Sequence, residues 1–309
     1  AHQVLEVKDL VVLDDRKLKA VNGLSLTVNA GEILGVAGVE GNGQREFVEA
    51  IAGMRQVVSG TIMMKQELDI TKSDPYEVHA ANVGHIPEDR EKHGLVASYS
   101  IADNLVLNRF DEPEFSAKGI RNFSGINTNA EALVEKFDVR TSSIKSSAAS
   151  LSGGNKQKVV VARELSAQPE LLVASQPTRG VDVGSIEFIH NQIIAARDAG
   201  AGVLLVSAEL DEILSLSDRI VVVHQGHVVA EMSGANADAP AFAVATKKRG
   251  SWKPAALKRS AIDLRTPVSI AVGINAMALP PNPPPTMRLP NAPTALAAST
   301  AASSSGHDT

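Results

Sequence analysis

The stretch Leu151-Ser152-Gly153-Gly154-Asn155-Lys156-Gln157 runs directly into a segment whose apolar residues have helical spacing, Lys156–Leu165. Serine is a favoured helix N-cap, and two glycines after it leave their backbone N–H groups open to an approaching anion. The helix dipole adds positive potential at the same end. We call residues 151–157 the signature. By itself it predicts either an anion-binding helix start or a plain N-cap and turn.

A second glycine-rich stretch, Gly38-Val39-Glu40-Gly41-Asn42-Gly43-Gln44-Arg45, follows an apolar run and opens an amphipathic helix pattern at 44–51. We call it the glycine loop. Its backbone N–H groups and the helix start form a nest for phosphate. A working phosphate loop reads G-x-x-x-x-G-K-[ST], with lysine on the phosphates and the hydroxyl on Mg²⁺. Gln44 and Arg45 occupy those last two positions, so a structural glycine turn remains open. A dinucleotide site needs G-x-G-x-x-G and a later acidic residue, and the loop has neither.

Apolar runs rich in Val, Leu and Ile alternate with helical patterns through most of the chain, at residues 32–39, 171–175 and 203–207. Such runs are typical of buried parallel strands. Two antiparallel pairs are expected at the edges, 4–10 with 24–29 and 220–224 with 227–231. The sequence therefore predicts an α/β fold with a mainly parallel sheet core and an antiparallel β edge. Residues 98–150 read as mostly helical and polar, within a helical subdomain at about 89–165.

The composition changes near residue 238. Residues 239–309 hold a loose basic stretch, seven prolines between 280 and 293, and an Ala/Ser/Thr tail, a composition typical of disorder. Residues 1–238 form the predicted domain. The chain starts without Met inside a strand pattern, so we expect it to be a fragment of a longer protein.

The charge balance and the absence of cysteine exclude several function classes. The chain has 30 Lys+Arg against 35 Asp+Glu, a net charge of −5, which argues against a general nucleic-acid binder. It has no cysteine, and therefore no disulfide, thiolate metal site or cysteine nucleophile. No apolar run reaches the roughly 18–20 residues that span a bilayer. Any membrane role is therefore expected through a partner.

Three histidines and three phenylalanines invite weaker interpretations. His79, His85 and His93 have spacings that match no compact metal motif, so we expect solvent-facing or capping roles and no metal site. We expect three aromatic side chains of the helical region to be buried in its hydrophobic core: Phe110, Phe115 and Phe123.

The apolar run at 171–175 leads into Gln176-Pro177-Thr178-Arg179-Gly180-Val181-Asp182, some 20 residues after the signature. Together with the glycine loop, this order resembles the nucleotide-binding domain of ABC transporters over roughly residues 4–235. The L-S-G-G-x-x-Q string is highly specific to that family. The variants G-V-E-G-N-G-Q and Q-P-T-R-G resemble the second, degenerate cassette of simple-sugar and nucleoside importers.

The resemblance assigns roles that this chain has largely lost. Non-catalytic residues stand at five family positions: Gln44 for lysine, Arg45 for Ser/Thr, Ser175 and Gln176 for the Asp-Glu pair, and Ala208 for the switch histidine. The family's magnesium-sensing glutamine matches Glu88, and residues 4–30 lack the aromatic that stacks on adenine. The expected nucleotide-contacting positions are Gly38, Gly41, Asn42, Gly43, Gln44, Arg45 and Glu88. Since these losses act together, we expect negligible ATP hydrolysis at this chain's own loop.

The signature is complete, and in the family it closes over ATP held by a second cassette. The resemblance therefore implies that five residues act in trans: Leu151, Ser152, Gly153, Gly154 and Gln157. Asp182 is implied in the loop that crosses the dimer interface. The implied partners are a second cassette, membrane permease subunits and, indirectly, a solute-binding protein, at the cytoplasmic face of the membrane. ATP is implied as ligand, with Mg²⁺ at the partner cassette's site and doubtful here.

Two other functions compete with this one. A soluble ABC ATPase acting on ribosomes or DNA is expected to keep its catalytic residues and to carry basic inserts, and residues 1–238 show neither. An unrelated dinucleotide-binding enzyme is disfavoured by the signature. The sequence does not name the transported solute.

Overall fold

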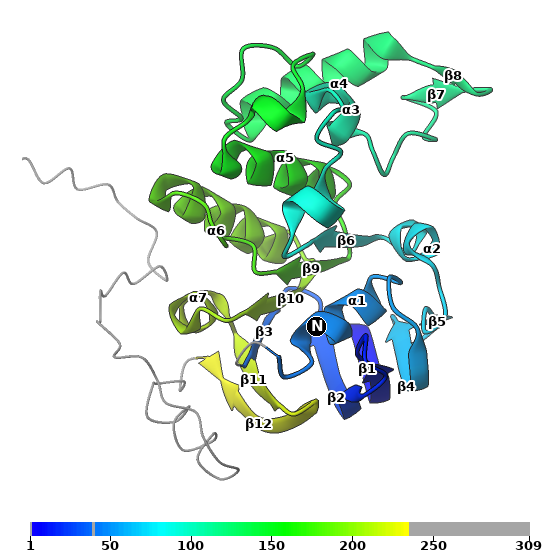
Figure 1. The fold of residues 1–309 in the computed structure, drawn as a ribbon, viewed down its shortest axis with the longest axis vertical. Helices are drawn as coiled ribbons and strands as arrows, with labels where there is room; N and C mark the ends of the chain where they lie inside the picture. The colour runs from blue at the N-terminus through cyan, green and yellow to red at the C-terminus, as the bar shows by residue number, and fades with distance from the viewer. Residues whose placement is uncertain (1, 39–40, 235–309) are drawn as a thin grey trace, which may run out of the picture. The chain divides into compact units, whose positions relative to one another are not determined.

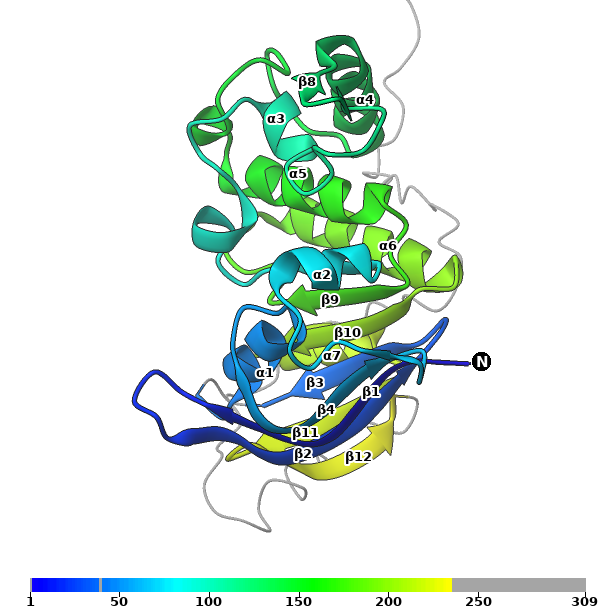
Figure 2. The ribbon, with the colours of Figure 1, turned by 90° about the vertical axis from the view of Figure 1, so that its right-hand side faces the viewer.

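The computed structural model describes residues 2–38 and 41–234, and the tail predicted for 239–309 lies outside them. A six-stranded sheet in the order β12-β11-β3-β10-β9-β6 forms the centre of this part (Figure 2). Its neighbouring pairs are parallel except at one edge, where β11 and β12 form an antiparallel hairpin. The strands are β3 Ile33–Ala37, β6 Val83–Ile86, β9 Leu171–Ser175, β10 Gly202–Ser207, β11 Arg219–His224 and β12 His227–Ser233.

This sheet is buried on both faces, which explains why its strands read as continuous apolar runs. In β10, Val203 and Leu205 belong to one hydrophobic cluster, whereas Leu204 and Val206 belong to another. Side chains alternate along a strand, so the two clusters lie on opposite faces of the sheet. The predicted parallel core and the 220–224 with 227–231 hairpin are therefore confirmed.

The predicted pairing of 4–10 with 24–29 is also confirmed, but it belongs to a separate sheet rather than to an edge of the parallel one. That antiparallel sheet has the order β2-β1-β4-β5 and comprises β1 Gln3–Leu13, β2 Lys19–Asn29, β4 Val57–Met64 and β5 Leu68–Asp69. Helix α1, Gln44–Ile51, lies between the two sheets (Figure 1). It buries Phe47 and Ile51 in the same hydrophobic cluster as residues of both sheets.

Three helices cover the other face of the parallel sheet: α5 Gly153–Ser166, α6 Val183–Asp198 and α7 Leu210–Leu216. The short helix α2, Pro75–Ala80, has Asp74 as its N-cap and Pro75 as its first residue. Asp74 accepts a hydrogen bond from the Glu77 backbone nitrogen, and the Glu77 carboxylate accepts one from the Asp74 nitrogen. This reciprocal capping box satisfies N–H groups that the helix leaves open.

The region 98–150 is less helical than predicted. It contains α3 Ile101–Leu105, α4 Phe123–Lys136, a 3₁₀ turn Ala148–Ser150 and a small hairpin of β7 Ser116–Ala117 and β8 Ile120–Arg121. Turn-forming residues between 111 and 119 and serines between 142 and 150 interrupt the helical pattern. In Figure 1, α3 and α4 lie beyond α5, away from the sheet. Their buried residues nevertheless belong to the cluster that covers the sheet, so the subdomain bounds stay a prediction.

Only one of the three phenylalanines in this region packs in the core. Phe115 is buried, whereas Phe110 and Phe123 are 59% and 63% exposed. Arg121 lies 5.1 Å from the centre of the Phe123 ring, a cation–π distance that suits an exposed aromatic side chain.

Candidate functional site

The carboxyl ends of three central strands bring the predicted site positions to one edge of the sheet. Ser207 at the end of β10 pairs with Ala37 of β3, and Val206 pairs with Ser175 of β9. The chain continues from these ends into Gly38, Gln176 and Ala208. In α/β sheets with parallel strands this edge is the usual place for a ligand.

The described part of the glycine loop is held by close backbone packing. A Cβ atom at Gly43, where φ is +96°, would lie 2.2 Å from the Ala20 carbonyl oxygen. A Cβ atom at Gly38 would lie 2.1 Å from the Gln44 side-chain nitrogen. The Asn42 side chain accepts a hydrogen bond from the Gln225 backbone nitrogen at 2.9 Å. Glycine is therefore required at both ends, and the side chain in the lysine position folds back onto the loop.

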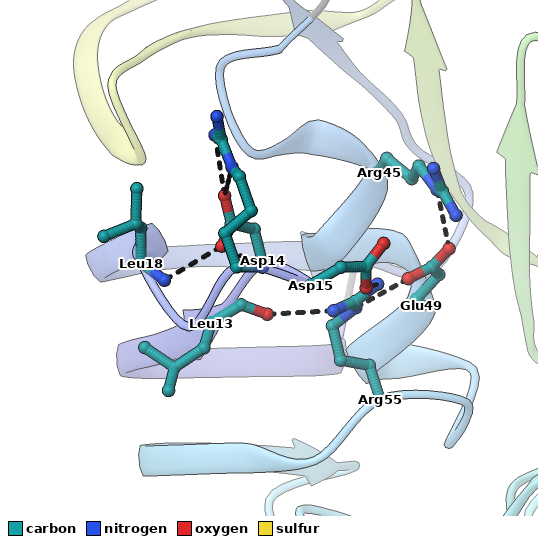
Figure 3. Close-up of polar contacts among 8 residues, drawn as sticks. Leu13, Asp14, Asp15, Leu18, Arg45, Glu49 and Arg55 are labelled. Atoms are coloured by element: carbon teal, nitrogen blue, oxygen red, sulfur yellow. Dashed lines mark hydrogen bonds and ion pairs between the residues drawn. The ribbon is translucent and has the colours of Figure 1, made fainter.

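Arg45, in the position of the metal-binding hydroxyl, is paired with an acid on its own helix. Its Nε donates to Glu49 at 2.8 Å, and Glu49 also accepts from Arg55 at 2.6 Å (Figure 3). Arg55 reaches on to Asp15 at 2.9 Å. The hydrogen bond to Glu49 raises the pKa of Arg45. Although burial opposes it, bonding to both arginines lowers the pKa of Glu49. This network keeps the carboxylate charged beside the loop.

Ser175 and Gln176, at the end of β9, form no acidic pair. Ser175 is buried and uncharged. Gln176 has a left-handed backbone with φ of +48°, and its side-chain oxygen accepts a hydrogen bond from the Ala208 backbone nitrogen at 3.2 Å. The two positions that the family uses for a general base and a switch histidine are thus joined by a neutral hydrogen bond.

Glu88 and Arg90 connect the end of β6 to the segment after β9, residues 176–182, which we call the linking segment. The Glu88 carboxylate is ion-paired with the Arg179 guanidinium. Arg90 donates to the carbonyl oxygens of Arg179 at 2.8 Å and Gly180 at 3.3 Å. Glu88 is therefore neutralised by an arginine.

A cleft of about 680 Å³ lies between these parts. Its lining draws on the glycine loop, α1, the chain after β6, the end of β9 and the linking segment, and includes Gly41, Arg45, His85, Glu88, Ser175 and Arg179. The structure thus brings Gly41 and Arg45 of the glycine loop, Glu88 and the end of β9 to one cleft, and nucleotide contact by these residues stays a prediction.

His85 corrects a prediction, because it is neither solvent-facing nor capping. It lies in β6, its Nε2 is buried and has no hydrogen-bond partner, and its backbone nitrogen donates to Glu164 at 3.0 Å. Burial lowers the pKa of His85 to about 4, against a smaller opposing effect of Glu164. The imidazole is therefore neutral at physiological pH.

Magnesium does not fit the residues around this cleft. The family's hydroxyl ligand is replaced by the cationic Arg45, and the Asp-Glu pair by Ser175 and Gln176, which carry no charge. The carboxylate of Glu88 is already bound by Arg179. Within residues 2–38 and 41–234 no group of three or more His, Asp or Glu side chains could hold a metal ion. Mg²⁺ prefers several oxygen ligands in octahedral geometry, which these side chains do not supply.

The signature forms the N-terminus of α5 and is complete. Ser152 is exposed and caps the helix, accepting hydrogen bonds from the Asn155 backbone nitrogen at 3.4 Å and side-chain nitrogen at 2.9 Å. Gln157 is buried, and its side chain donates to the Pro177 carbonyl oxygen at 2.8 Å. Leu151 is buried beneath them. Leu151 and Gln157, the two ends of the signature, are thus structural, whereas Ser152 is exposed.

Asp182, which is predicted to lie at the interface with a second cassette, also has a structural function. It is the N-cap of α6, accepting from the Ser185 backbone nitrogen at 3.0 Å and from its hydroxyl at 2.9 Å. The hydrogen bond from the Ser185 backbone is the main reason that the pKa of Asp182 is lowered. A Cβ atom at Gly154 would lie 2.5 Å from both the Asp182 carboxylate and the Ser185 hydroxyl. Glycine at 154 therefore lets the signature helix contact the start of α6.

Comparison with known proteins agrees with this geometry. A family model described as ABC transporter matches residues 21–179. The chain belongs to the ABC transporter family.

Solved ABC cassettes share the fold, and curated ABC relatives share the sequence. A nucleotide-free ATP-binding cassette from an ABC transporter has a TM-score of 0.64 at 22% identity, covering 75% of this chain and 92% of that one. A nucleoside import ATP-binding protein of Lactococcus lactis is 50% identical over 73% of this chain and 44% of its own length. A guanosine import ATP-binding protein of Bacillus subtilis is 45% identical over 75% and 45%. The chain spans less than half the length of these relatives.

Sequence reasoning missed Arg55, which bonds Glu49, and Arg90, which bonds the linking segment. Neither arginine stands at a position to which the resemblance assigns a role. The signature residues do not belong to the lining of the 680 Å³ cleft in the described part of the chain.

In residues 2–38 and 41–234 no helix has the length and apolar character needed to cross a bilayer.

Proposed function

We propose that this chain is an ATP-binding component of an importer for a nucleoside or simple sugar, in which its own cleft does not hydrolyse ATP. Its signature completes the ATP site of a second cassette. Family membership implies nucleotide binding, and the relatives are named as import ATP-binding proteins for nucleosides, guanosine, glucose and ribose. The solute class follows from those names.

One contrast carries the proposal. In the cleft, each position that would polarise water or hold Mg²⁺ is uncharged or neutralised by an ion pair, as at Gln176 and Glu88. At the signature, Ser152 is exposed and caps the helix, and Gly153 and Gly154 follow at the start of a 14-residue helix. An outward-facing helix start is suited to a phosphate held by another molecule.

The proposed partners follow from this division. The second cassette supplies the G-x-x-x-x-G-K-[ST] loop, the acidic pair and the bound Mg²⁺. Permease subunits carry the solute across the membrane and receive it from a solute-binding protein. The assembly places this domain at the cytoplasmic face of the membrane as a peripheral component.

Reconstitution tests the proposal. The chain is co-expressed with a cassette that has intact catalytic motifs and with the permease subunits, and ATP hydrolysis and nucleoside uptake are measured in proteoliposomes. We expect hydrolysis to require both cassettes and uptake to require the permease. Recovery of ribosomes or DNA instead of permease in a pull-down would favour the soluble alternative, and full hydrolysis without this chain would refute the proposal.

A further inference from the structure

Arg90 lies between the start of the signature helix and the linking segment, and both are distant from Arg90 in the sequence. It is the first residue of a π-helical turn, Arg90–Gly94, whose start is capped by the Asp89 carboxylate. Its guanidinium donates to two main-chain carbonyl oxygens of the linking segment, at 2.8 Å to Arg179 and 3.3 Å to Gly180. One planar group therefore fixes two consecutive peptide units, which matches the fork geometry of arginine.

The same guanidinium lies against the start of the signature helix. A Cβ atom at Gly153 would lie 3.1 Å from the terminal nitrogen of Arg90 and 3.3 Å from the Gly180 carbonyl oxygen. Contacts this tight leave no room for a larger residue at 153 without displacing one of them. Arg90 and Gly180 thus form one side of the surface against which the signature begins.

Neither helix stability nor charge pairing explains this arrangement. A cation near a helix N-terminus opposes the helix dipole, so Arg90 is not placed to stabilise α5. Among the residues that the structure describes, Arg90 forms no ion pair with a carboxylate, and its Nε is buried without a partner. Its hydrogen bonds go to the linking segment, which indicates a function in holding that segment.

Other contacts hold the linking segment from its remaining sides. The Pro177 carbonyl oxygen accepts from Gln157 of the signature at 2.8 Å. The Thr178 hydroxyl donates to the buried carboxylate of Glu212 on α7, also at 2.8 Å. Asp182, at the end of the segment, fits against Gly154. Arg90 adds the contact at the middle of the segment, where Gly180 has a left-handed φ of +66°.

We propose that Arg90 is a positioning residue that sets the linking segment against the start of α5. It thereby fixes where the Ser152 hydroxyl and Asp182 are presented to the partner cassette, without any ligand in this chain's own cleft. The effect on catalysis rests on the proposed function. The effect on local structure does not, and the two are measured separately.

The first measurement is amide hydrogen exchange on the full chain by itself, for wild type, Arg90→Gln and Arg90→Lys. Arg90→Lys keeps the charge but cannot donate to two carbonyl groups in a fixed plane. We expect exchange in residues 179–184 and 153–156 to rise at least about fivefold in both variants, since both lose the paired bonds. Arg16→Gln is the control, because Arg16 is 79% exposed and bonds Asp14 on the distant β1–β2 turn.

The second measurement is ATP hydrolysis by the reconstituted assembly. The partner's own phosphate loop sets most of the affinity for ATP, whereas the signature acts on the closed state. We therefore expect kcat to fall about tenfold or more in Arg90→Gln and Arg90→Lys, with KM for ATP within about twofold. Arg16→Gln is expected to retain wild-type kcat.

The outcomes separate the two claims. Unchanged exchange in both Arg90 variants overturns the positioning proposal, whatever the kinetics show. Increased exchange with unchanged kcat overturns the catalytic consequence while the local claim stands. Full restoration by Arg90→Lys in both measurements overturns the geometric argument, because charge alone would then suffice. If hydrolysis does not depend on this chain, the proposed function fails, and exchange still decides the local claim.

Discussion

The side-chain oxygen of Gln176 accepts a hydrogen bond from the backbone nitrogen of Ala208 at 3.2 Å. The resemblance to ABC domains assigns the general base and the switch histidine to these two positions, so the contact joins residues whose loss of catalytic function is a prediction. An amide at position 176 can accept this bond without carrying charge. The result is a fixed and chemically neutral strand edge beside the cleft.

Because this strand edge carries no charged catalytic group, we expect the purified chain to release no measurable phosphate from MgATP. Losing a general base costs roughly 10²–10⁴ in rate, and the lysine, the metal ligands and the histidine are missing as well. Phosphate release is the measurement, and turnover near 1 s⁻¹ would contradict the prediction. Gln44→Lys is expected to restore little, because Ser175, Gln176 and Ala208 remain.

Ser152→Asp is expected to abolish ATP hydrolysis by the reconstituted pair while leaving this chain folded. Aspartate is as good an N-cap as serine, so α5 should keep its start. A carboxylate about 4 Å from a phosphate costs about 4 kcal/mol at an effective dielectric constant of 20. Hydrolysis should fall by about 10²–10³-fold in a coupled ATPase assay.

Ser152→Asn separates charge from shape in the same assay. Asparagine also caps well but is neutral, so its loss of hydrolysis should be smaller than that of aspartate by about tenfold or more. Thermal melting should be similar for both variants. Equal rates for wild type and Ser152→Asp would remove the main support for a signature acting in trans.

Gly154→Ala is expected to destabilise the domain by about 1–3 kcal/mol. Its new methyl group would lie 2.5 Å from the Asp182 carboxylate and the Ser185 hydroxyl, so these two side chains must move and the cap of α6 that they form is disturbed. Urea unfolding followed by circular dichroism measures the change. Gly184→Ala is the matched control, since its closest contact is 3.5 Å, and it is expected to be neutral or slightly stabilising. Equal destabilisation by both would contradict the packing argument.

Acidification is expected to destabilise the domain through His85. Its pKa is about 4 in the folded chain and near 6.5 when unfolded, so the unfolded state binds more protons between these values. The contribution is fully present above pH 6.5 and is lost as the pH falls toward 4. Burial disfavours the protonated imidazole most, and the nearby Glu164 carboxylate opposes this only in part.

His85→Gln tests this linkage because glutamine stays neutral at every pH. The free energy of unfolding is measured by urea titration at several pH values from 7 to 4. Over that range the wild type should lose on the order of 2 kcal/mol more than the variant. Parallel curves for the two proteins would show that His85 does not titrate in this window.

The sequence by itself determined the strands that are buried on both faces and the motifs that follow them. Residues 171–175 and 44–51 form β9 and α1 with the predicted bounds, because a short continuous apolar run and a 3.6-residue period have few alternative structures. The residue types at Arg45 and Gln176 can also be read from the sequence, and the loss of catalytic function that they imply stays a prediction. Region 98–150 was predicted less well, because its polar, Ser-rich sequence has weak periodicity.

Only the tertiary structure decided which charges meet. Arg179 pairs with Glu88 across 91 positions of sequence, and Arg90 reaches Gly180 across 90. Long side chains have many rotamers and no periodic pattern, so their partners are chosen by the packing that brings distant segments together. The same packing leaves His85 on β6 half-buried, with its Nε2 enclosed, beside α5, which its spacing from other histidines does not reveal. The local sequence pattern determines the helices and strands. The packing of one element against another determines which side chains interact.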